Sequence, residues 1–269
     1  MAAFRREKGL SHVESLATCL VEVRVLKPQL FDAAVVDLDG TMVDTLGDFV
    51  AALNRMLVEL SLPSVSRAVV ERGVGKGSEH LVHSVLNHLL ASENRASLAI
   101  NNIADWDGVH VDGALFQAAC ASYQQHYEAI NGQHAEVYPG VVQGLQSMQH
   151  AGLKLACLTN KPVAFARSLL QAKGLDGYFS TVFGGDSFAH KKPDPRPLLK
   201  TCEALGTSPA RSLMVGDSAN DAQAARAAGC PVVLVTYGYN HGEPVRGVDA
   251  DGFMDSLVQW NALSYELPG

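Results

Sequence analysis

The chain has 269 residues, of which 47% are hydrophobic and 18% are charged, and its formal net charge at pH 7 is −7. This composition is typical of a globular protein and excludes disorder as the main state. A chain of this length forms one large domain or a domain with a smaller companion. The acidic balance lacks the positive field that nucleic acid or an anionic membrane surface attracts, so we expect neither as a partner.

Cysteine usage and the first 30 residues predict a cytoplasmic protein. The five cysteines are widely spaced and form no Cys-x-x-Cys pair, which argues against a disulfide framework and against a structural zinc site. We interpret residues 1–30 as an N-terminal extension and not as a signal peptide, because Glu22 and Arg24 interrupt their weak apolar stretch. No apolar run approaches the ~18 residues of a membrane span. The oligomeric state stays open.

Short apolar runs predict buried strands. There are four of them: Ala33–Val36, Leu155–Leu158, Leu213–Val215 and Val232–Val235. Helical patterns at 165–173 and 219–228 separate the later runs, and each ends at a glycine, the residue that best tolerates a left-handed C-cap. This alternation predicts an α/β fold with a doubly wound parallel sheet.

The segment between the first two predicted strands has a different pattern. Residues 48–135 show helical periodicity, for example at Leu53, Leu57 and Leu60, and lack comparable apolar runs. We therefore expect a helical insert at 48–135 within a core domain formed by residues 31–47 and 136–269.

Two carboxylates follow the first predicted strand. They are Asp37 and Asp39, with Gly40 and Thr41 directly after them. Ligands bind at the carboxyl ends of strands in an open α/β sheet, and two adjacent acids need a cation or a shared proton between them. The pattern thus indicates a divalent cation or an acid–base pair, with a solvated Asp-Gly turn as the alternative. The same Asp-x-Asp-Gly motif at Asp105–Gly108 follows no apolar run, so we predict a loop there.

Further polar residues follow the other predicted strands. Thr159 and Asn160 suit phosphate oxygens, although an N-cap uses the same residue types. Lys192 is held extended by the proline after it and can project into a site, unless it belongs to a surface turn. Asp217 and Asp221 lie four residues apart at a helix start and can face one point. Together these groups predict magnesium and a phosphoryl group at one edge of the sheet.

The order of these motifs strongly resembles the haloacid dehalogenase superfamily, whose phosphatases carry an Asp-x-Asp-Gly-Thr loop, a Ser/Thr loop, a Lys-Pro segment and a Gly-Asp-x-x-x-Asp loop. The resemblance covers residues 31 to about 47 and 136 to 240. It implies a Rossmann-like core, in which the helical insert is a mobile cap. Within the superfamily, Val74–Ser78 and Thr236–Asn240 are similar to the bacterial phosphoglycolate phosphatases.

The resemblance also implies roles for the strand-end residues. Asp37 would be the nucleophile that forms an aspartyl-phosphate, and Asp39 would be the general acid and base. Mg²⁺ would be held by Asp37, the backbone carbonyl of Asp39 and Asp217, with Asp221 in or near its coordination. The expected phosphate-binding residues are Thr41, Thr159, Asn160 and Lys192.

Substrate choice is expected to depend on the insert. Its Lys76 lies in a glycine-rich turn that departs from the P-loop pattern, and it either holds a substrate carboxylate or belongs to a surface loop. His80 and His83 lack a third metal ligand, so we predict a solvated helix face.

The expected function is a magnesium-dependent phosphatase of a small phosphorylated metabolite, with 2-phosphoglycolate as the expected substrate. Alternatives are another phosphatase of the superfamily, a sugar-phosphate mutase, a phosphonatase that uses Lys76 for a Schiff base, or a non-catalytic binding module. Asp39 favours phosphoryl transfer over halide displacement, because dehalogenases of the superfamily lack this second aspartate.

Overall fold

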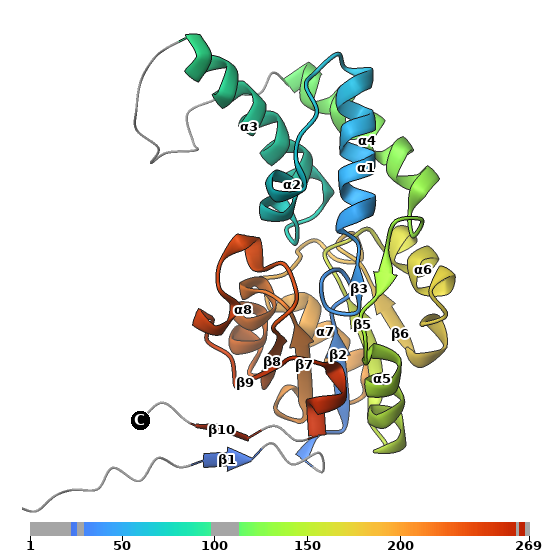
Figure 1. Cartoon of the computed structure of the whole chain (residues 1–269). Helices are drawn as coiled ribbons and strands as arrows, with labels where there is room; N and C mark the ends of the chain where they lie inside the picture. The colour runs from blue at the N-terminus through green and yellow to red at the C-terminus, as the bar shows by residue number, and fades with distance from the viewer. Residues whose placement is uncertain (1–22, 26–29, 98–112, 262–263, 267–269) are drawn as a thin grey trace, which may run out of the picture.

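A computed structural model describes residues 23–25, 30–97, 113–261 and 264–266 of the chain. Its centre is a parallel sheet of six strands in the order β6-β5-β2-β7-β8-β9 (Figure 1). The strands are β2 (Ala33–Val36), β5 (Lys154–Leu158), β6 (Thr181–Phe183), β7 (Ser212–Gly216), β8 (Val232–Val235) and β9 (Gly252–Met254). The predicted α/β fold with a doubly wound parallel sheet is confirmed.

Helices cover both faces of this sheet. They are α5 (Val141–His150), α6 (Val163–Ala172), α7 (Arg196–Leu205) and α8 (Ala219–Ala228). Alternate residues of each strand point to opposite faces, so Ala34 and Val36 pack with α5 and α6, whereas Ala33 and Val35 pack with α7 and α8. Burial on both faces explains why these strands are continuous apolar runs.

The four apolar runs of the sequence all form strands of this sheet. Both predicted helices are also present, and α8 ends at the predicted Gly229, whose φ of 76° is left-handed. The strands β6 and β9 were not predicted. Each has only three residues, and Thr181 and Gly252 break their apolar character.

A separate bundle of helices lies beyond the carboxyl end of the sheet, at the top of Figure 1. It contains α1 (Leu46–Glu59), α2 (Arg67–Gly73), α3 (Ser78–Ser97) and α4 (Gly113–Ile130), and we call it the helical unit. A two-stranded ribbon of β3 (Val43–Asp44) and β4 (Glu136–Val137) joins it to the core. The unit has its own apolar cluster, in which Leu53, Met56 and Tyr123 are buried.

Short elements complete the fold. Strands β1 (Val23–Val25) and β10 (Ser264–Glu266) pair antiparallel. The 3₁₀ helices are η2 (Asp176–Tyr178), η3 (Pro209–Arg211), η4 (Asn240–Gly242), η5 (Val245–Gly247) and η6 (Leu257–Asn261). The loop predicted at Asp105–Gly108 lies outside the described residues. No helix among the described residues has the length and apolar character needed to cross a membrane.

The topology places a ligand site at the end of β2. From this central strand the chain first builds β5 and β6 on one side and then β7, β8 and β9 on the other. Strand order therefore reverses at β2, and open α/β sheets bind ligands at such a switch point, outside the carboxyl ends of the strands. The helical unit faces the same edge (Figure 1).

Candidate active site

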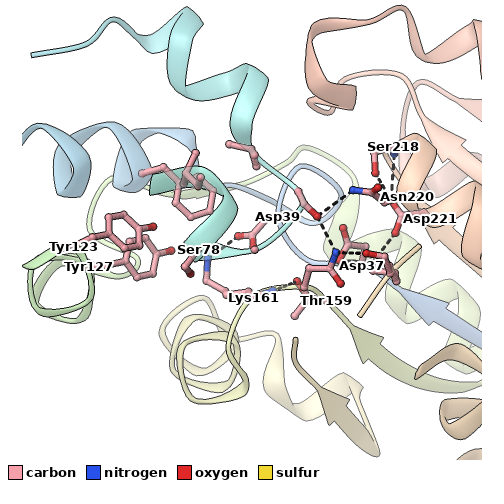
Figure 2. A pocket seen from close by; sticks show the side chains of 17 residues that line it. Asp37, Asp39, Ser78, Tyr123, Tyr127, Thr159, Lys161, Ser218, Asn220 and Asp221 are labelled. Carbon is pink, nitrogen blue, oxygen red and sulfur yellow. Dashed lines mark hydrogen bonds and ion pairs between the residues drawn. The ribbon is translucent and has the colours of Figure 1, made fainter. Parts of the chain in front are cut away.

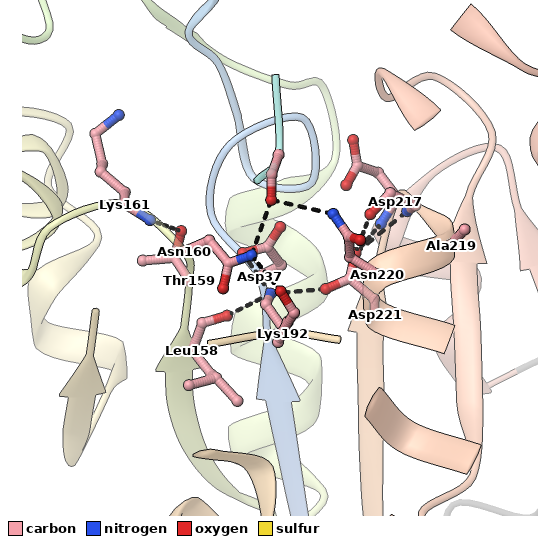
Figure 3. A network of polar contacts seen from close by, with 12 residues as sticks. Asp37, Leu158, Thr159, Asn160, Lys161, Lys192, Asp217, Ala219, Asn220 and Asp221 are labelled. Atoms are coloured by element: carbon pink, nitrogen blue, oxygen red, sulfur yellow. Dashed lines mark hydrogen bonds and ion pairs between the residues drawn. The ribbon is translucent and has the colours of Figure 1, made fainter. Parts of the chain in front are cut away.

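Asp37 is the first residue after β2 and lies at the centre of a network of polar side chains at the strand ends (Figure 3). Its backbone N–H donates to the carbonyl of Val215 at 2.9 Å, which extends the sheet by one residue and fixes the side chain at the strand end. Its side chain is 11% exposed. Burial raises the pKa of Asp37 to about 7, against the opposing effect of the Lys192 ammonium.

A tight turn after Asp37 directs Asp39 toward the helical unit. The backbone N–H groups of residues 41–43 all point at the carbonyl of Leu38. Gly40 has a φ of 81°, and a Cβ there would collide with the carboxylate of Asp217. Glycine is therefore required for both conformation and space. The Asp39 carboxylate pairs with the ammonium of Lys161 at 2.8 Å.

Lys192 is a buried cation between two carboxylates. Its Nζ lies 2.9 Å from Oδ1 of Asp37 and 2.7 Å from Oδ1 of Asp221, and it donates to the carbonyl of Leu158 at 2.8 Å (Figure 3). Burial alone would lower the pKa of Lys192, but Asp221 and Asp37 outweigh it and raise the pKa. This ammonium therefore stays charged, as the predicted phosphate-binding role requires.

The start of α8 positions the remaining two acids. Asp217 accepts a hydrogen bond from the backbone N–H of Tyr239 at 2.8 Å. Asp221 occupies the third position of α8, and its Oδ2 accepts from the N–H and the hydroxyl of Ser218, at 3.2 and 2.8 Å. Such a capping box satisfies free N–H groups of the first turn and locks the direction of the carboxylate.

The three buried acids Asp37, Asp217 and Asp221 form a group suited to a metal ion. One carboxylate oxygen of each lies within 4.8 Å of the others. Burial, followed by repulsion from Asp221 and Asp37, raises the pKa of Asp217 well above its usual value. A divalent cation would relieve this repulsion, and an all-oxygen donor set suits a hard cation such as Mg²⁺ or Ca²⁺. The residues present thus fit a divalent metal.

Thr159 and Asn160, the residues after β5, line the pocket and also have hydrogen-bond partners within the chain. Thr159 is buried, and its Oγ1 accepts from the N–H of Lys161 at 3.2 Å. The amide nitrogen of Asn160 donates to the carbonyl of Gly75 at 2.9 Å and to that of Lys192 at 2.8 Å. Both N–H bonds of this amide are therefore used, and Asn160 connects the helical unit to the core. A phosphate oxygen would have to displace one of these carbonyls.

Two residues predicted for the site do not line the pocket that lies between the core and the helical unit. Thr41 is fully buried, its hydroxyl has no partner in the described part of the chain, and it does not line the pocket. Lys76 is exposed, whereas its neighbours Gly75 and Gly77 line the pocket. Burial and then the Lys76 ammonium lower the pKa of His241.

The two histidines of α3, His80 and His83, are exposed. His80 contacts Ser84 at 3.4 Å and His83 contacts Asn87 at 3.2 Å, each one turn along the same exposed helix face. Neither belongs to a group that could hold a metal among the described residues.

The pocket itself lies between the core and the helical unit (Figure 2). Several residues that line the pocket had no role assigned from the sequence, among them Phe49, Tyr127, Lys161 and Asn220. Lys161 directly follows the Thr159-Asn160 pair, so its place at a strand end was the available signal. The aromatic residues lie inside helices and gave none.

Comparison with known proteins agrees with this geometry. The sequence pattern of the haloacid dehalogenase-like hydrolases matches residues 34–235. A phosphoglycolate phosphatase of Thiobacillus denitrificans is 42% identical over 232 residues, which are 86% of this chain and 95% of that protein. A plasmid-encoded phosphoglycolate phosphatase of Cupriavidus necator is 41% identical over 86% of this chain and 92% of its own length.

Solved structures show the same fold. A protein described as a predicted phosphoglycolate phosphatase from Haemophilus somnus superposes with a TM-score of 0.77 at 30% identity, covering 86% of this chain and 96% of that one. A haloacid dehalogenase-like hydrolase from Bacteroides fragilis has a TM-score of 0.70 at 21% identity, over 85% of this chain and 99% of its own, a likeness of fold alone. Since the family pattern spans most of the chain and the relatives align over nearly their whole length, the chain belongs to the haloacid dehalogenase-like hydrolases and is a phosphoric monoester hydrolase.

Proposed function

We propose that this protein is a Mg²⁺-dependent phosphatase that converts 2-phosphoglycolate to glycolate and phosphate. The observation that carries the proposal is the placement of Asp37 beside the Lys192 ammonium and within the group of three buried acids, at the switch point of the sheet. A carboxylate, a buried ammonium and a metal-binding group at one point suit phosphoryl transfer, in which positioning and charge stabilisation supply most of the catalysis. Relatives named phosphoglycolate phosphatase that are more than 40% identical to this chain support the substrate.

In the proposed reaction, Asp37 attacks phosphorus in line and forms an aspartyl-phosphate. Asp39 protonates the leaving ester oxygen and then removes a proton from the water that hydrolyses the aspartyl-phosphate. Lys192 neutralises the negative charge of the phosphoryl oxygens, and Thr159 donates a hydrogen bond to them. The side chains of Asp37 and Asp217 and the backbone carbonyl of Asp39 would hold Mg²⁺, which would screen the phosphate dianion from the nucleophile.

Asp221 is assigned a place beside the metal ligands. Its Oδ1 pairs with Lys192 and its Oδ2 accepts from the start of α8, so both oxygens already have partners. This arrangement suits a group that orients the true ligands and the lysine.

The helical unit is proposed to act as a cap that closes over the pocket. Residues 48–135 would form this cap and residues 31–47 and 136–269 the core domain. The two-stranded ribbon β3–β4 is the connection at which such a motion would occur. Closure excludes water from a reactive phosphoenzyme, which is a common function of lids.

A turnover screen tests this function. The purified protein should hydrolyse 2-phosphoglycolate in the presence of Mg²⁺ with a higher kcat/KM than phosphorylated three-carbon acids, sugar phosphates, nucleotides and phosphonates. Preferred interconversion of sugar phosphates would instead indicate a mutase, and cleavage of a carbon–phosphorus bond would indicate a phosphonatase. The exposed position of Lys76 gives no support to a Schiff base. Absence of turnover on every substrate would favour a binding module.

A further inference from the structure

We propose that Lys161 and Tyr127 together form the subsite that binds the substrate's carboxylate. The inference rests on the proposed function, because it assumes a phosphate ester with a carboxylate on the carbon next to the ester oxygen. It assigns recognition to one residue of the core and one of the helical unit, and not to Lys76.

Lys161 is a buried cation with a single carboxylate partner among the described residues. Its Nζ lies 2.8 Å from Oδ1 of Asp39, and its side chain is 3% exposed. The same nitrogen lies 4.7 Å from the ring centres of Phe49 and Tyr127, which come from α1 and α4. Figure 2 shows Lys161 and Tyr127 at the same end of the pocket. An ammonium makes up to three hydrogen bonds, and ring faces stabilise a cation without using them. Lys161 can therefore accept a second anion without leaving Asp39.

Tyr127 supplies an independent observation. It is 1% exposed and lines the pocket, yet its hydroxyl has no hydrogen-bond partner in the described part of the chain. The ring is fixed by stacking on Phe49 and on Tyr123, with centroid separations of 5.5 and 5.6 Å. Buried phenols normally find a partner, because an unpaired buried hydroxyl is destabilising. A substrate oxygen in the pocket would provide that partner.

The covalent structure of the substrate fixes where its carboxylate must bind. In 2-phosphoglycolate the carboxylate carbon is two bonds from the ester oxygen, and the proposed role of Asp39 places its carboxyl group at that oxygen. The group that binds the substrate carboxylate must therefore lie within a few ångströms of Asp39. Lys161 meets this condition.

The other lysines fit less well. Lys161 and Lys192 are the cationic residues that line this pocket, and Lys192 already holds Asp37, Asp221 and the Leu158 carbonyl. Lys76 is exposed and does not line the pocket.

The first experiment compares paired substrates in Lys161→Gln and Tyr127→Phe. For 2-phosphoglycolate, kcat/KM should fall about 10- to 100-fold more than for p-nitrophenyl phosphate, the range expected for a lost hydrogen bond to a charged group. Most of the extra loss in Tyr127→Phe should lie in KM. Lys200→Gln, the same change at an exposed lysine paired with Glu203, is the matched control and should alter neither substrate.

The second experiment measures binding without turnover. Inhibition constants against p-nitrophenyl phosphate are determined for 3-phosphonopropionate and for propylphosphonate, which differ by the carboxylate. The wild-type protein should bind the former more tightly, and Lys161→Gln should remove this difference. Tyr127→Phe deletes one oxygen atom and keeps the packing, so it tests the subsite even if Lys161→Gln fails to fold.

The outcomes separate the subsite from the proposed function. If the wild-type protein hydrolyses p-nitrophenyl phosphate but shows no preference for 2-phosphoglycolate, the proposed function fails and the subsite with it. If the wild-type preference is intact and the variants lose both substrates equally, Lys161 only positions Asp39 and the subsite alone is overturned. A selective loss in Lys76→Gln, with none in Lys161→Gln, would also overturn it.

Discussion

The phenol oxygen of Tyr239 lies 2.6 Å from Oδ1 of Asp44 and accepts from the backbone N–H groups of Thr45 and Leu46 at 2.8 and 3.1 Å. Tyr239 belongs to the loop after β8, whereas the other three residues lead from the ribbon into α1. One buried phenol thus fixes the connection on which the helical unit is mounted. The same residue uses its backbone N–H to hold Asp217.

Replacement of this phenol should destabilise the fold. Tyr239→Phe removes three hydrogen bonds and leaves the N–H of Thr45 without its partner, whereas the Leu46 N–H still donates to Oδ1 of Asp44. We therefore expect a loss of about 1–3 kcal/mol in the free energy of unfolding. Urea titration measures the change. Tyr178→Phe, which removes a hydroxyl that accepts from the exposed Gln146, is the control and should have a smaller effect. Equal stability of Tyr239→Phe and wild type would show that the contact does not stabilise the fold.

The two acids after β2 should be separable by trapping the phosphoenzyme. Asp37→Asn removes the nucleophile with little change of shape and should abolish both turnover and phosphoenzyme. Asp39→Asn should slow turnover by ~10² to 10⁴, with accumulation of aspartyl-phosphate. Rapid-quench assays with ³²P-labelled substrate distinguish the variants. Label retained on Asp37→Asn would assign the nucleophile elsewhere.

The buried acids make the response to Mg²⁺ dependent on pH. The folded-state pKa of Asp37 is about 7 and its usual value is 3.8, so burial favours the protonated form. Without metal, this group's contribution to stability falls as pH rises from about 4 to 7, since only the unfolded chain ionises freely. Metal binding requires the ionised carboxylate. The increase in Tm on addition of Mg²⁺ should therefore be larger at pH 8 than at pH 5.

Thermal unfolding with Mg²⁺ or with a chelator measures this effect. Asp37→Asn serves as the control, because it lacks the titrating group and should show a smaller dependence of the Mg²⁺ shift on pH. A Mg²⁺ shift that is the same at both pH values in the wild-type protein would contradict the prediction.

The carbonyl of Gly75 offers a test of contact between the helical unit and the core. It accepts from the side-chain amides of Asn160 and Asn220, at 2.9 and 3.1 Å. In Asn220→Ala we expect faster hydrogen exchange at residues 75–78 and a KM raised several-fold, because one of these two bonds is lost. Asn54→Ala is the matched control, since Asn54 bonds Val65 within the helical unit. Unchanged exchange at residues 75–78 would show that the Asn160 bond suffices.

A buried acid at the base of α1 gives a further prediction for stability. Asp48 is fully buried and accepts from the N–H groups of Gly132 and His134, both at 2.7 Å. It thereby joins α1 to the segment that returns to the core. Asp48→Ala should destabilise the protein by about 1–3 kcal/mol, measured by urea titration. Asp48→Asn should recover part of this loss, because its amide oxygen can still accept one bond.

The sheet could be predicted because burial on both faces makes local sequence informative. Val35 and Val36 face opposite helix layers, so neither position tolerates a polar residue, and the run is visible without any knowledge of its neighbours. The acids at the strand ends were equally visible, since parallel topology brings such ends to one edge.

Partnerships across the chain could not be predicted in this way. Asn160 follows a strand and has the donors that phosphate needs, yet its amide bonds Gly75, a residue 85 positions away in the sequence. The aromatic rings that contact Lys161 lie on two helices of the helical unit. The spacing of residues in the sequence does not indicate which helix faces which strand. These contacts depend on how the helical unit sits on the core.

The bond from Asn160 to Gly75 has a consequence for how this protein can change in evolution. The core binds the main-chain carbonyl of Gly75 and not a side chain of the helical unit. The contact therefore depends on the shape of the turn, in which Gly75 has a φ of 103°. Residues elsewhere in the helical unit can then vary, and with them the ligand that is accepted, while the asparagines that hold the turn stay the same. Side-chain changes in the helical unit can therefore alter its part of the pocket without breaking this main-chain contact with the core.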